Sequence, residues 1–378
     1  MGHARVLVAV GISMFLAGLP AAAQTDDIQC GDTITTSTRL THDLECPGTD
    51  TPALRVVGSD VVLDLGGHTV RRSGPVMTGS EGIAVLANST VSNGTIRGFE
   101  LGYVLDSYPQ HPDHVRLSGL SFIDNRIAVY NRSGGNTTFT ITNSLLLRND
   151  VGLGSEQDAG SGTFEVRSTF FIGHRLAFSA NYHSVDVANS TFSLNETVFL
   201  CPYGSVTFTS SIIMRNDVVG RLPLGEFGYG FCSVASFVDT EFLFNGAFAP
   251  TEQPTWEPFD FVLRNSRVVG NDSGLPVRAR TVDVRGNTWR NNGGGLSLGD
   301  LPEYVPPPLT GTVSGNRFLR NQGDGLRVLV PSTLTVSSNV ALDNTGWGIY
   351  APGVIDGGGN VARGNGAGDC VGVVCASR

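Results

Sequence analysis

The feature that most constrains this chain of 378 residues is an internal repeat. One seven-residue pattern recurs in which a small residue or Asn comes first, a large apolar residue stands fourth and Asn usually comes last. The segments 143–149 (NSLLLRN) and 189–195 (NSTFSLN) are clear copies. The closing positions, 21 to 29 residues apart, are 99, 125, 149, 174, 195, 216, 245, 271, 292, 321, 344 and 365. A regular period of roughly 20 to 50 residues is typical of solenoids and other repeat architectures.

Each copy also contains the same set of short strands. Apolar and polar side chains alternate before the closing residue, as in 115–117, 139–141 and 185–187, and this period of two predicts a half-buried strand. A second apolar position lies three residues before the closing residue, and a third apolar segment follows it. Helical periodicity is absent. We therefore predict an all-β fold, a single-stranded right-handed parallel β-helix of about 12 to 13 coils with three short parallel sheets.

The recurring Asn has a structural explanation. It tolerates the left-handed bend between two strands, and its amide can bond the equivalent amide one coil along. We expect a structural role for these residues, and we interpret His174, which occupies one closing position, as a structural substitute.

The N-terminal segment indicates export. Residues 1–23 have the Arg5, apolar run and small-residue cleavage site of a secretory signal peptide. After them we expect an N-terminal cap at 24–55, the β-helix at 56–366 and a C-terminal cap or tail at 367–378. The prediction is a secreted, periplasmic or extracellular protein with no membrane span after signal cleavage.

Six cysteines, an even number in an exported chain, favour disulfides over metal binding. They fall into three local pairs, and there is no CxxC motif or histidine at ligand spacing. We expect the pairs Cys30–Cys46, Cys201–Cys232 and Cys370–Cys375, with Cys201–Cys232 joining neighbouring coils.

Charge narrows the chemistry. The net charge of −9 argues against nucleic acid as a partner. All 25 basic residues are Arg, so Schiff-base chemistry on Lys is excluded and any catalytic base must be His, Tyr, Arg or a carboxylate.

Three N-terminal segments, 30–34 (CGDTI), 43–46 (DLEC) and 62–69 (VLDLGGHT), look like the first coils of exported bacterial β-helix proteins. Together with the repeats, these segments resemble the right-handed parallel β-helix proteins of the pectin-lyase-like superfamily. The resemblance covers most of the mature chain, residues 56–365. That superfamily contains polysaccharide lyases, hydrolases, C5 epimerases and proteins without an assigned activity. The motifs of the polygalacturonase-type hydrolases are absent here. Outward carboxylates are sparse, so neither a metal site nor a cofactor is expected; a calcium ion is possible but not indicated.

The candidate catalytic residues are His111, Asp113 and His114, in an enlarged turn. The segment resembles the Asp-Pro-His-Asp element of alginate C5 epimerases with the acid and His positions exchanged. Abstraction of a proton beside a carboxylate needs a base, an acid and a group that neutralises the carboxylate. The alternative is an ordinary surface turn.

Candidate substrate-binding residues are Tyr182 and His183, which share a turn column with that segment, and Arg126, Arg148 and Arg175, which flank the closing positions. The arginines can neutralise uronate carboxylates, or they can form a solvated edge. Two Pro-rich insertions, 248–258 with Trp256 and 301–309 with Tyr304, can line or shield a groove.

Two functions follow from these observations. The first is an exported protein that binds or modifies a polysaccharide, with uronate-containing chains among the candidates, and acts as a lyase or C5 epimerase rather than a hydrolase if it is catalytic. The second is a non-catalytic extracellular or surface repeat protein.

Overall fold

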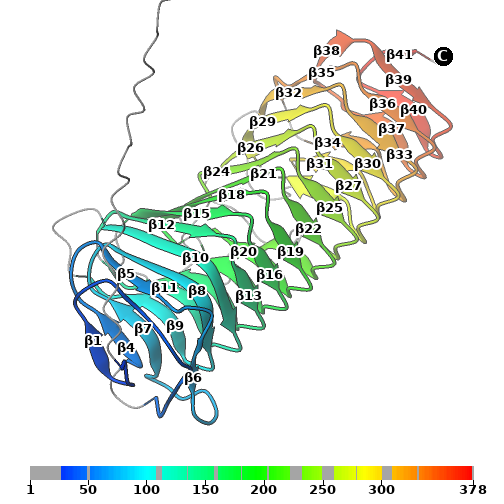
Figure 1. The fold of residues 1–378 in the computed structure, drawn as a ribbon. Helices are drawn as coiled ribbons and strands as arrows, with labels where there is room; N and C mark the ends of the chain where they lie inside the picture. Colours follow the sequence, from blue (N-terminus) through cyan, green and yellow to red (C-terminus); the bar gives the residue numbers. More distant parts are fainter. Residues whose placement is uncertain are drawn as a thin grey trace, which may run out of the picture.

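The computed structural model describes residues 27–48, 52–107, 113–133, 135–156, 161–179, 181–201, 204–221, 232–248, 259–277, 279–299, 309–329 and 332–376. Within them the chain winds into a parallel β-solenoid without helices, and successive coils stack from the N-terminal to the C-terminal end (Figure 1). Every strand pairing is parallel and joins equivalent positions of neighbouring coils, as in Val115↔Phe139 and Phe139↔Phe164. The predicted fold class, an all-β parallel solenoid with three sheets, is confirmed.

The first sheet contains the longer alternating strands. It comprises β2 (Thr38–Arg39), β5 (Val61–Asp64), β12 (Thr137–Thr142), β15 (Gly162–Arg167), β18 (His183–Ala188), β21 (Ser205–Thr209), β24 (Val234–Val238), β26 (Phe259–Arg264), β29 (Ala279–Arg285), β32 (Thr310–Ser314), β35 (Thr335–Ser337) and β38 (Ile355–Gly358). Two longer strands, β8 (Ser89–Arg97) and β10 (Asp113–Ile123), run on into the second sheet and belong to both.

The second sheet follows each first-sheet strand after a sharp corner. It comprises β3 (Leu44–Cys46), β6 (Thr69–Arg72), β13 (Leu145–Leu147), β16 (Phe170–Ile172), β19 (Thr191–Ser193), β22 (Ile212–Met214), β25 (Glu241–Leu243), β27 (Arg267–Val269), β30 (Thr288–Arg290), β33 (Arg317–Leu319), β36 (Val340–Leu342), β39 (Asn360–Arg363) and β41 (Cys375–Ala376).

The third sheet closes each coil and is divided into two parts. The nine-stranded part comprises β1 (Asp32–Ile34), β4 (Leu54–Val56), β7 (Glu81–Val85), β9 (Leu101–Leu105), β11 (Ile127–Asn131), β14 (Val151–Ser155), β17 (Leu176–Ser179), β20 (Thr197–Leu200) and β23 (Val218–Arg221). The five-stranded part comprises β28 (Leu275–Val277), β31 (Leu296–Leu298), β34 (Leu326–Val328), β37 (Trp347–Tyr350) and β40 (Gly368–Val371).

The core consists of columns of inward-pointing side chains that run along the solenoid axis. Period-two alternation turns every second residue of a strand inward, and the parallel register stacks it on its equivalent in the next coil. Phe171 stacks on Phe192 with 4.5 Å between ring centroids, and Trp289 stacks on Phe318 at 4.8 Å. Each fully buried aromatic side chain contributes about 2 to 3 kcal/mol by leaving water, so the repeat builds its stability one column member at a time.

Closing asparagines form an amide ladder at the corner between the second and third sheets. The backbone N–H and the Nδ2 of Asn125 both donate to Oδ1 of Asn149, at 2.9 and 3.0 Å. This second-corner ladder continues coil by coil through Asn195, Asn216, Asn245, Asn271, Asn292, Asn321, Asn344 and Asn365. The ladder prediction is confirmed. The expectation that the closing Asn itself bends left-handed is wrong, because the residue before it does so, as at Arg148 (φ 50°).

His174 substitutes for Asn in this ladder. Its Nδ1 accepts from the backbone N–H of Asn149 (3.1 Å) as an Oδ1 would, and its Nε2–H donates to the carbonyl of Leu146 (3.1 Å) as an Nδ2 would. Burial lowers the pKa of His174 from 6.5 to about 4, so the ring is neutral at pH 7. Its neutral form is the one that can accept and donate in place of an amide.

A second ladder closes the corner between the first and second sheets. Its first members are hydroxyls, and a backbone N–H donates to the hydroxyl of the next coil from Ser144 to Thr169, from Thr169 to Ser190 (3.1 Å), from Ser190 to Ser211 and from Thr240 to Ser266. Its last members are amides that bond twice, as from Asn287 to Asn316 (3.0 and 2.9 Å). The members of this first-corner ladder are Ser144, Thr169, Ser190, Ser211, Thr240, Ser266, Asn287, Asn316, Asn339 and Asn360.

The cysteines form the three pairs that the sequence predicts, Cys30–Cys46, Cys201–Cys232 and Cys370–Cys375. Such bonds are consistent with an oxidising extracellular or periplasmic location. Strands β1 to β3 already pair in register with the next coil, within the segment assigned to the N-terminal cap. The predicted signal peptide, residues 1–23, lies outside the described residues.

Candidate functional site

The outer face of the first sheet is polar from β10 to β21. Inward residues fill the core, and the residues between them point to solvent in three rows that run along the solenoid. One edge row is His114, Thr138, Thr163, Ser184 and Ser205. The middle row is Arg116, Thr140, Glu165, Asp186 and Thr207, and the other edge row is Ser118, Thr142, Arg167, Ala188 and Thr209. We name these residues the first-sheet face.

Two carboxylates lie side by side in the middle of this face. Glu165 on β15 is the direct register partner of Asp186 on β18, so their backbones are one strand spacing apart, about 4.8 Å. Both residues are half-buried, and neither forms an ion pair with any residue that the structure describes. The Arg167 guanidinium donates to the main-chain oxygen of Asp186 (2.6 Å), which sets a positive charge beside the pair.

Hydroxyl groups frame these carboxylates. Thr140 precedes Glu165 and Thr207 follows Asp186 in the middle row, while Thr163 and Ser184 flank them in the edge row. Ser205 Oγ donates to Ser184 Oγ at 2.8 Å, so part of the edge row is already ordered. The result is a flat array of hydrogen-bonding groups repeated at the spacing of the coils.

The predicted catalytic segment is described only in part. Asp113 begins β10, and His114 follows on the outer face, where its backbone N–H donates to Asn88 Oδ1 (2.9 Å). The His114 side chain is exposed at the start of the edge row, two strands before Thr163. His111 and the Asp113 side chain lie outside the description, as do Trp256 and Tyr304 of the two insertions.

Tyr182 and His183, adjacent in sequence, point in different directions. Tyr182 is 44% exposed and has a left-handed backbone (φ 54°) immediately before β18. His183 is the first residue of β18 and faces inward with Val185 and Val187, so it is fully buried. A solvent-borne substrate does not reach this imidazole in the folded chain.

A buried network holds the His183 ring. Asn131 Nδ2 donates to His183 Nε2 (2.9 Å), and His183 Nδ1–H donates to the carbonyl of Asn181 (2.5 Å). Burial lowers the pKa of His183, which keeps the ring neutral. The ring reaches Asn131 by passing over Gly162, where a Cβ would lie 2.9 Å from the imidazole and 2.6 Å from the Thr137 carbonyl. The surroundings therefore require glycine at that position.

The three predicted substrate-binding arginines lie at the second corner, and each contacts a carboxylate of the preceding coil. Arg126 contacts Glu100 (2.6 Å). The guanidinium of Arg148 makes a two-point contact with Asp124 (2.8 and 3.2 Å), and that of Arg175 makes one with Asp150 (2.6 and 3.1 Å). The hydrogen bonds to these carboxylates raise the pKa values of Arg148 and Arg175. A uronate would have to compete with an internal carboxylate for each guanidinium.

Glu165 and Asp186 are not among the candidates predicted from the sequence, although the repeat contains a signal for them. Each stands nine residues before a closing position, at 174 and 195, so alignment of the repeats places both in one outward row of adjacent coils. In the described residues no group of three or more His, Cys, Asp or Glu side chains could hold a metal ion. Nor does this part of the chain contain a helix that could cross a membrane.

No protein-family profile matches the sequence. A search of curated proteins likewise finds no match. Among solved structures, the chain is similar to the catalytic unit of a thermostable GH87 α-1,3-glucanase from Streptomyces thermodiastaticus strain HF3-3. The TM-score is 0.48 and the sequence identity 15%, over 91% of this chain and 69% of the glucanase chain.

Proposed function

We propose that this chain is an exported polysaccharide-binding β-solenoid, a distant member of the pectin-lyase-like superfamily, and that the glycan lies along the first-sheet face. The observation that carries the proposal is the adjacent pair Glu165 and Asp186, outside any described ion pair and framed by hydroxyls. Carboxylate and hydroxyl oxygens hydrogen-bond sugar hydroxyls strongly. A ligand of repeating units also suits groups that recur once per coil.

Several sequence candidates enter the proposal. His114 lies in an edge row of the face, and Tyr182 is exposed in the turn before β18, where an aromatic ring can cover a sugar. His111 and Asp113 belong to the turn that leads into His114 and are proposed with it. The arginines of the second corner and His183 are left out, because the former are ion-paired and the latter is buried.

A catalytic version of this proposal rests on the same pair of carboxylates. Two carboxyl groups near one bond can supply an acid and a base, which is the requirement for glycosidic cleavage. Elimination or C5 epimerisation, which the sequence favours, needs in addition a cation for the uronate carboxylate, and Arg116 is the arginine of the middle row. The products distinguish these reactions.

The test is a binding and product screen of the secreted chain against α- and β-glucans, chitosan, alginate and polygalacturonate. We expect at least one polymer to retard the protein in affinity electrophoresis. New reducing ends alone would indicate hydrolysis, unsaturated ends elimination, and inverted C5 centres epimerisation. Absence of binding to every polymer would reject the proposal and favour the non-catalytic repeat protein.

A variant with Glu165→Gln and Asp186→Asn locates the site. The matched control is Asp283→Asn, since Asp283 occupies the same outward row but forms ion pairs with Arg264 and Arg285. Loss of binding in the double variant alone supports the first-sheet face. Equal binding in all three proteins would place the glycan elsewhere.

A further inference from the structure

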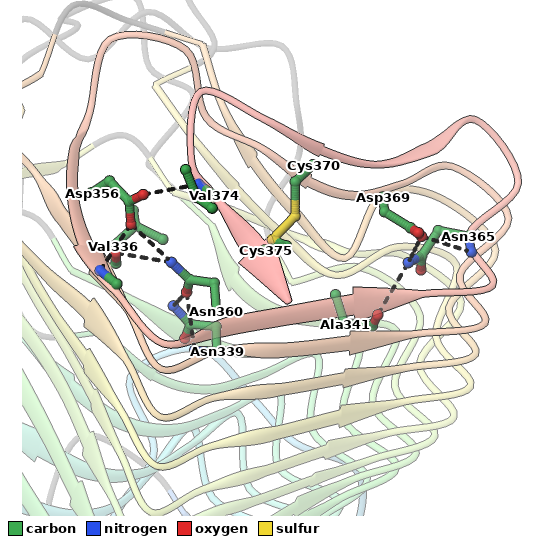
Figure 2. Close-up of a disulfide and its surroundings, with 11 residues drawn as sticks. Val336, Asn339, Ala341, Asp356, Asn360, Asn365, Asp369, Cys370, Val374 and Cys375 are labelled. Atoms are coloured by element: carbon green, nitrogen blue, oxygen red, sulfur yellow. Dashed lines mark hydrogen bonds between the residues drawn. A yellow bond between two sulfur atoms is a disulfide. The ribbon is translucent and has the colours of Figure 1, made fainter. Parts of the chain in front are cut away.

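The C-terminal ends of the two ladders have a common solution. Asn365, the last member of the second-corner ladder, donates from its Nδ2 to Oδ1 of Asp369 (2.9 Å). Asn360, the last member of the first-corner ladder, donates to Oδ1 of Asp356 (3.3 Å). Both ladders thus end on an aspartate four residues from their last Asn, as Figure 2 shows.

The chemistry of the two side chains explains this choice. A ladder Asn accepts at Oδ1 from the preceding coil and donates its own N–H groups to the following coil. Each Asn therefore needs another acceptor beyond it, and a ladder made only of Asn always leaves its last N–H groups without one. An ionised Asp accepts in the same way but offers no side-chain donor. The aligned amides also carry partial positive charge at the end where their N–H groups point, as a helix does at its N-terminus, and a carboxylate there is favourable.

The same aspartates hold the final segment in place. Asp356 accepts from the backbone N–H groups of Gly358 (2.9 Å) and Val374 (2.8 Å), and so joins β38 to the approach to β41. The disulfide Cys370–Cys375 ties β40 to β41, which in turn pairs with β39 through Asn360↔Cys375 (Figure 2). Carboxylate, ladder and disulfide therefore meet in one small region.

We propose that residues 355–376 form a terminating cap in which Asp356 and Asp369 stop the two ladders, and that this cap prevents end-to-end association with a second copy of the chain. An open solenoid end presents unpaired strand groups, and such edges are templates for strand addition. An uncapped last coil would present the N–H groups of its ladder Asn residues to a coil of a second copy. A residue that accepts without donating ends that propagation.

The cap is sensitive to acid and to reduction. The backbone N–H of Val374, followed by that of Gly358, holds the pKa of Asp356 below its ordinary value. The hydrogen bonds that Asp356 accepts from Gly358 and Val374 are therefore intact above the ordinary carboxyl pKa and are lost as the pH falls through the lowered value. The other titratable or charged residues on the neighbouring strands β35, β37, β39, β40 and β41 are Tyr350, Arg363 and Asp369. Reduction of Cys370–Cys375 releases β41 independently of pH.

Hydrogen exchange of the full chain at neutral pH tests the termination. Asp369→Ala removes the acceptor of the last ladder amide, so peptides from β36 to β40 should exchange about tenfold faster or more. Asp369→Asn keeps an acceptor and should have a smaller effect. The control is Asp343→Asn or Asp343→Ala, because Asp343 is exposed beside the ladder without joining it. Equal exchange in Asp369→Ala and Asp343→Ala would overturn the proposal.

Light scattering after size exclusion tests the closure of the end. The wild-type chain should keep one mass at all concentrations, and the variant Asp356→Asn with Asp369→Asn should gain mass with concentration after reduction of the disulfides. Asp343→Asn, reduced in the same way, controls for the loss of disulfides and charge. An uncapped variant whose end exchanges fast but whose mass never rises would refute the role in preventing association.

Discussion

The coils from β10 to β27 and those from β29 to β39 follow the same solenoid path, but different side chains form the ladder at the first corner. In the earlier coils a hydroxyl receives one bond from the preceding coil, as Ser190 does from Thr169. In the later coils an amide receives two, as Asn316 does from Asn287. The middle outward row differs as well, since Glu165 and Asp186 have no ion-pair partner among the described residues and Asp283 has two. In the later coils the middle-row carboxylate Asp283 is paired with arginines of the same chain, whereas in the earlier coils Glu165 and Asp186 have no described ion pair and are available for a ligand.

The largest effect should come from the ladder itself. Asn316→Ala leaves two buried donors of Asn287 without an acceptor, at about 1 to 3 kcal/mol each, so we expect a loss of about 4 kcal/mol in the free energy of unfolding. Ser190→Ala removes one hydroxyl and should cost about 1 kcal/mol. Chemical denaturation of both variants measures the difference. Similar losses would show that the two kinds of corner are energetically equivalent.

A pH effect should distinguish the imidazole step of the second-corner ladder. Because the pKa of His174 is depressed to about 4 in the folded chain, the neutral ring stabilises the fold fully above the unfolded pKa of 6.5. That stabilisation is lost as the pH falls from 6.5 towards 4 and amounts to about 3 kcal/mol. His174→Asn continues the amide ladder and should remove this part of the pH dependence. An unchanged profile of stability against pH would contradict the assigned role.

The next largest effect should be on glycan affinity, which should depend on the earlier coils and not on the later ones. Replacement of Glu165 and Asp186 by Gln and Asn should reduce the affinity for the bound glycan about tenfold or more, since a hydrogen bond to a charged group is about 0.5 to 1.5 kcal/mol stronger than the neutral bond that each amide can still form. Asp283→Asn, in a later coil, should leave the affinity unchanged. Isothermal titration of the three proteins gives the comparison directly. A stronger loss in Asp283→Asn would reverse the assignment of the two regions.

The smallest effect should come from the second-corner arginines. Arg175→Ala breaks an exposed ion pair with Asp150, so the loss of stability should stay below about 1 kcal/mol and shrink in high salt. Glycan affinity should not change. A tenfold loss of affinity would instead make this guanidinium part of the binding site, as the sequence predicts for a uronate ligand.

Most of the fold could be predicted from the repeat, because its signals lie within short segments of the sequence. Period-two alternation and the closing Asn column each predict a contact between equivalent positions of adjacent coils, and the pair Cys201–Cys232 predicts a link between neighbouring coils. The structure contains these contacts. His174 could be interpreted in the same way, from its place in the column. Residues in short turns were harder to place. His183 begins β18 rather than lying in the turn, and this shift of one position turns its ring into the core and leaves Tyr182 outside.

Contacts between charged side chains of adjacent coils were also not predicted from the sequence. The partner of Arg148 is 24 residues earlier, and it becomes a neighbour only when the coils are stacked in register. The same stacking brings Glu165 beside Asp186. Alignment of the repeats on their closing residues would have revealed both contacts, whereas the reach of each side chain comes only from the structure.

The most direct test of the division between the two sets of coils is hydrogen exchange with and without saturating glycan. We expect slower exchange in peptides from β10, β12, β15, β18 and β21 and no change in those from β29, β32 and β35. Protection confined to the later coils, or to the second corner beside Arg148 and Arg175, would contradict it.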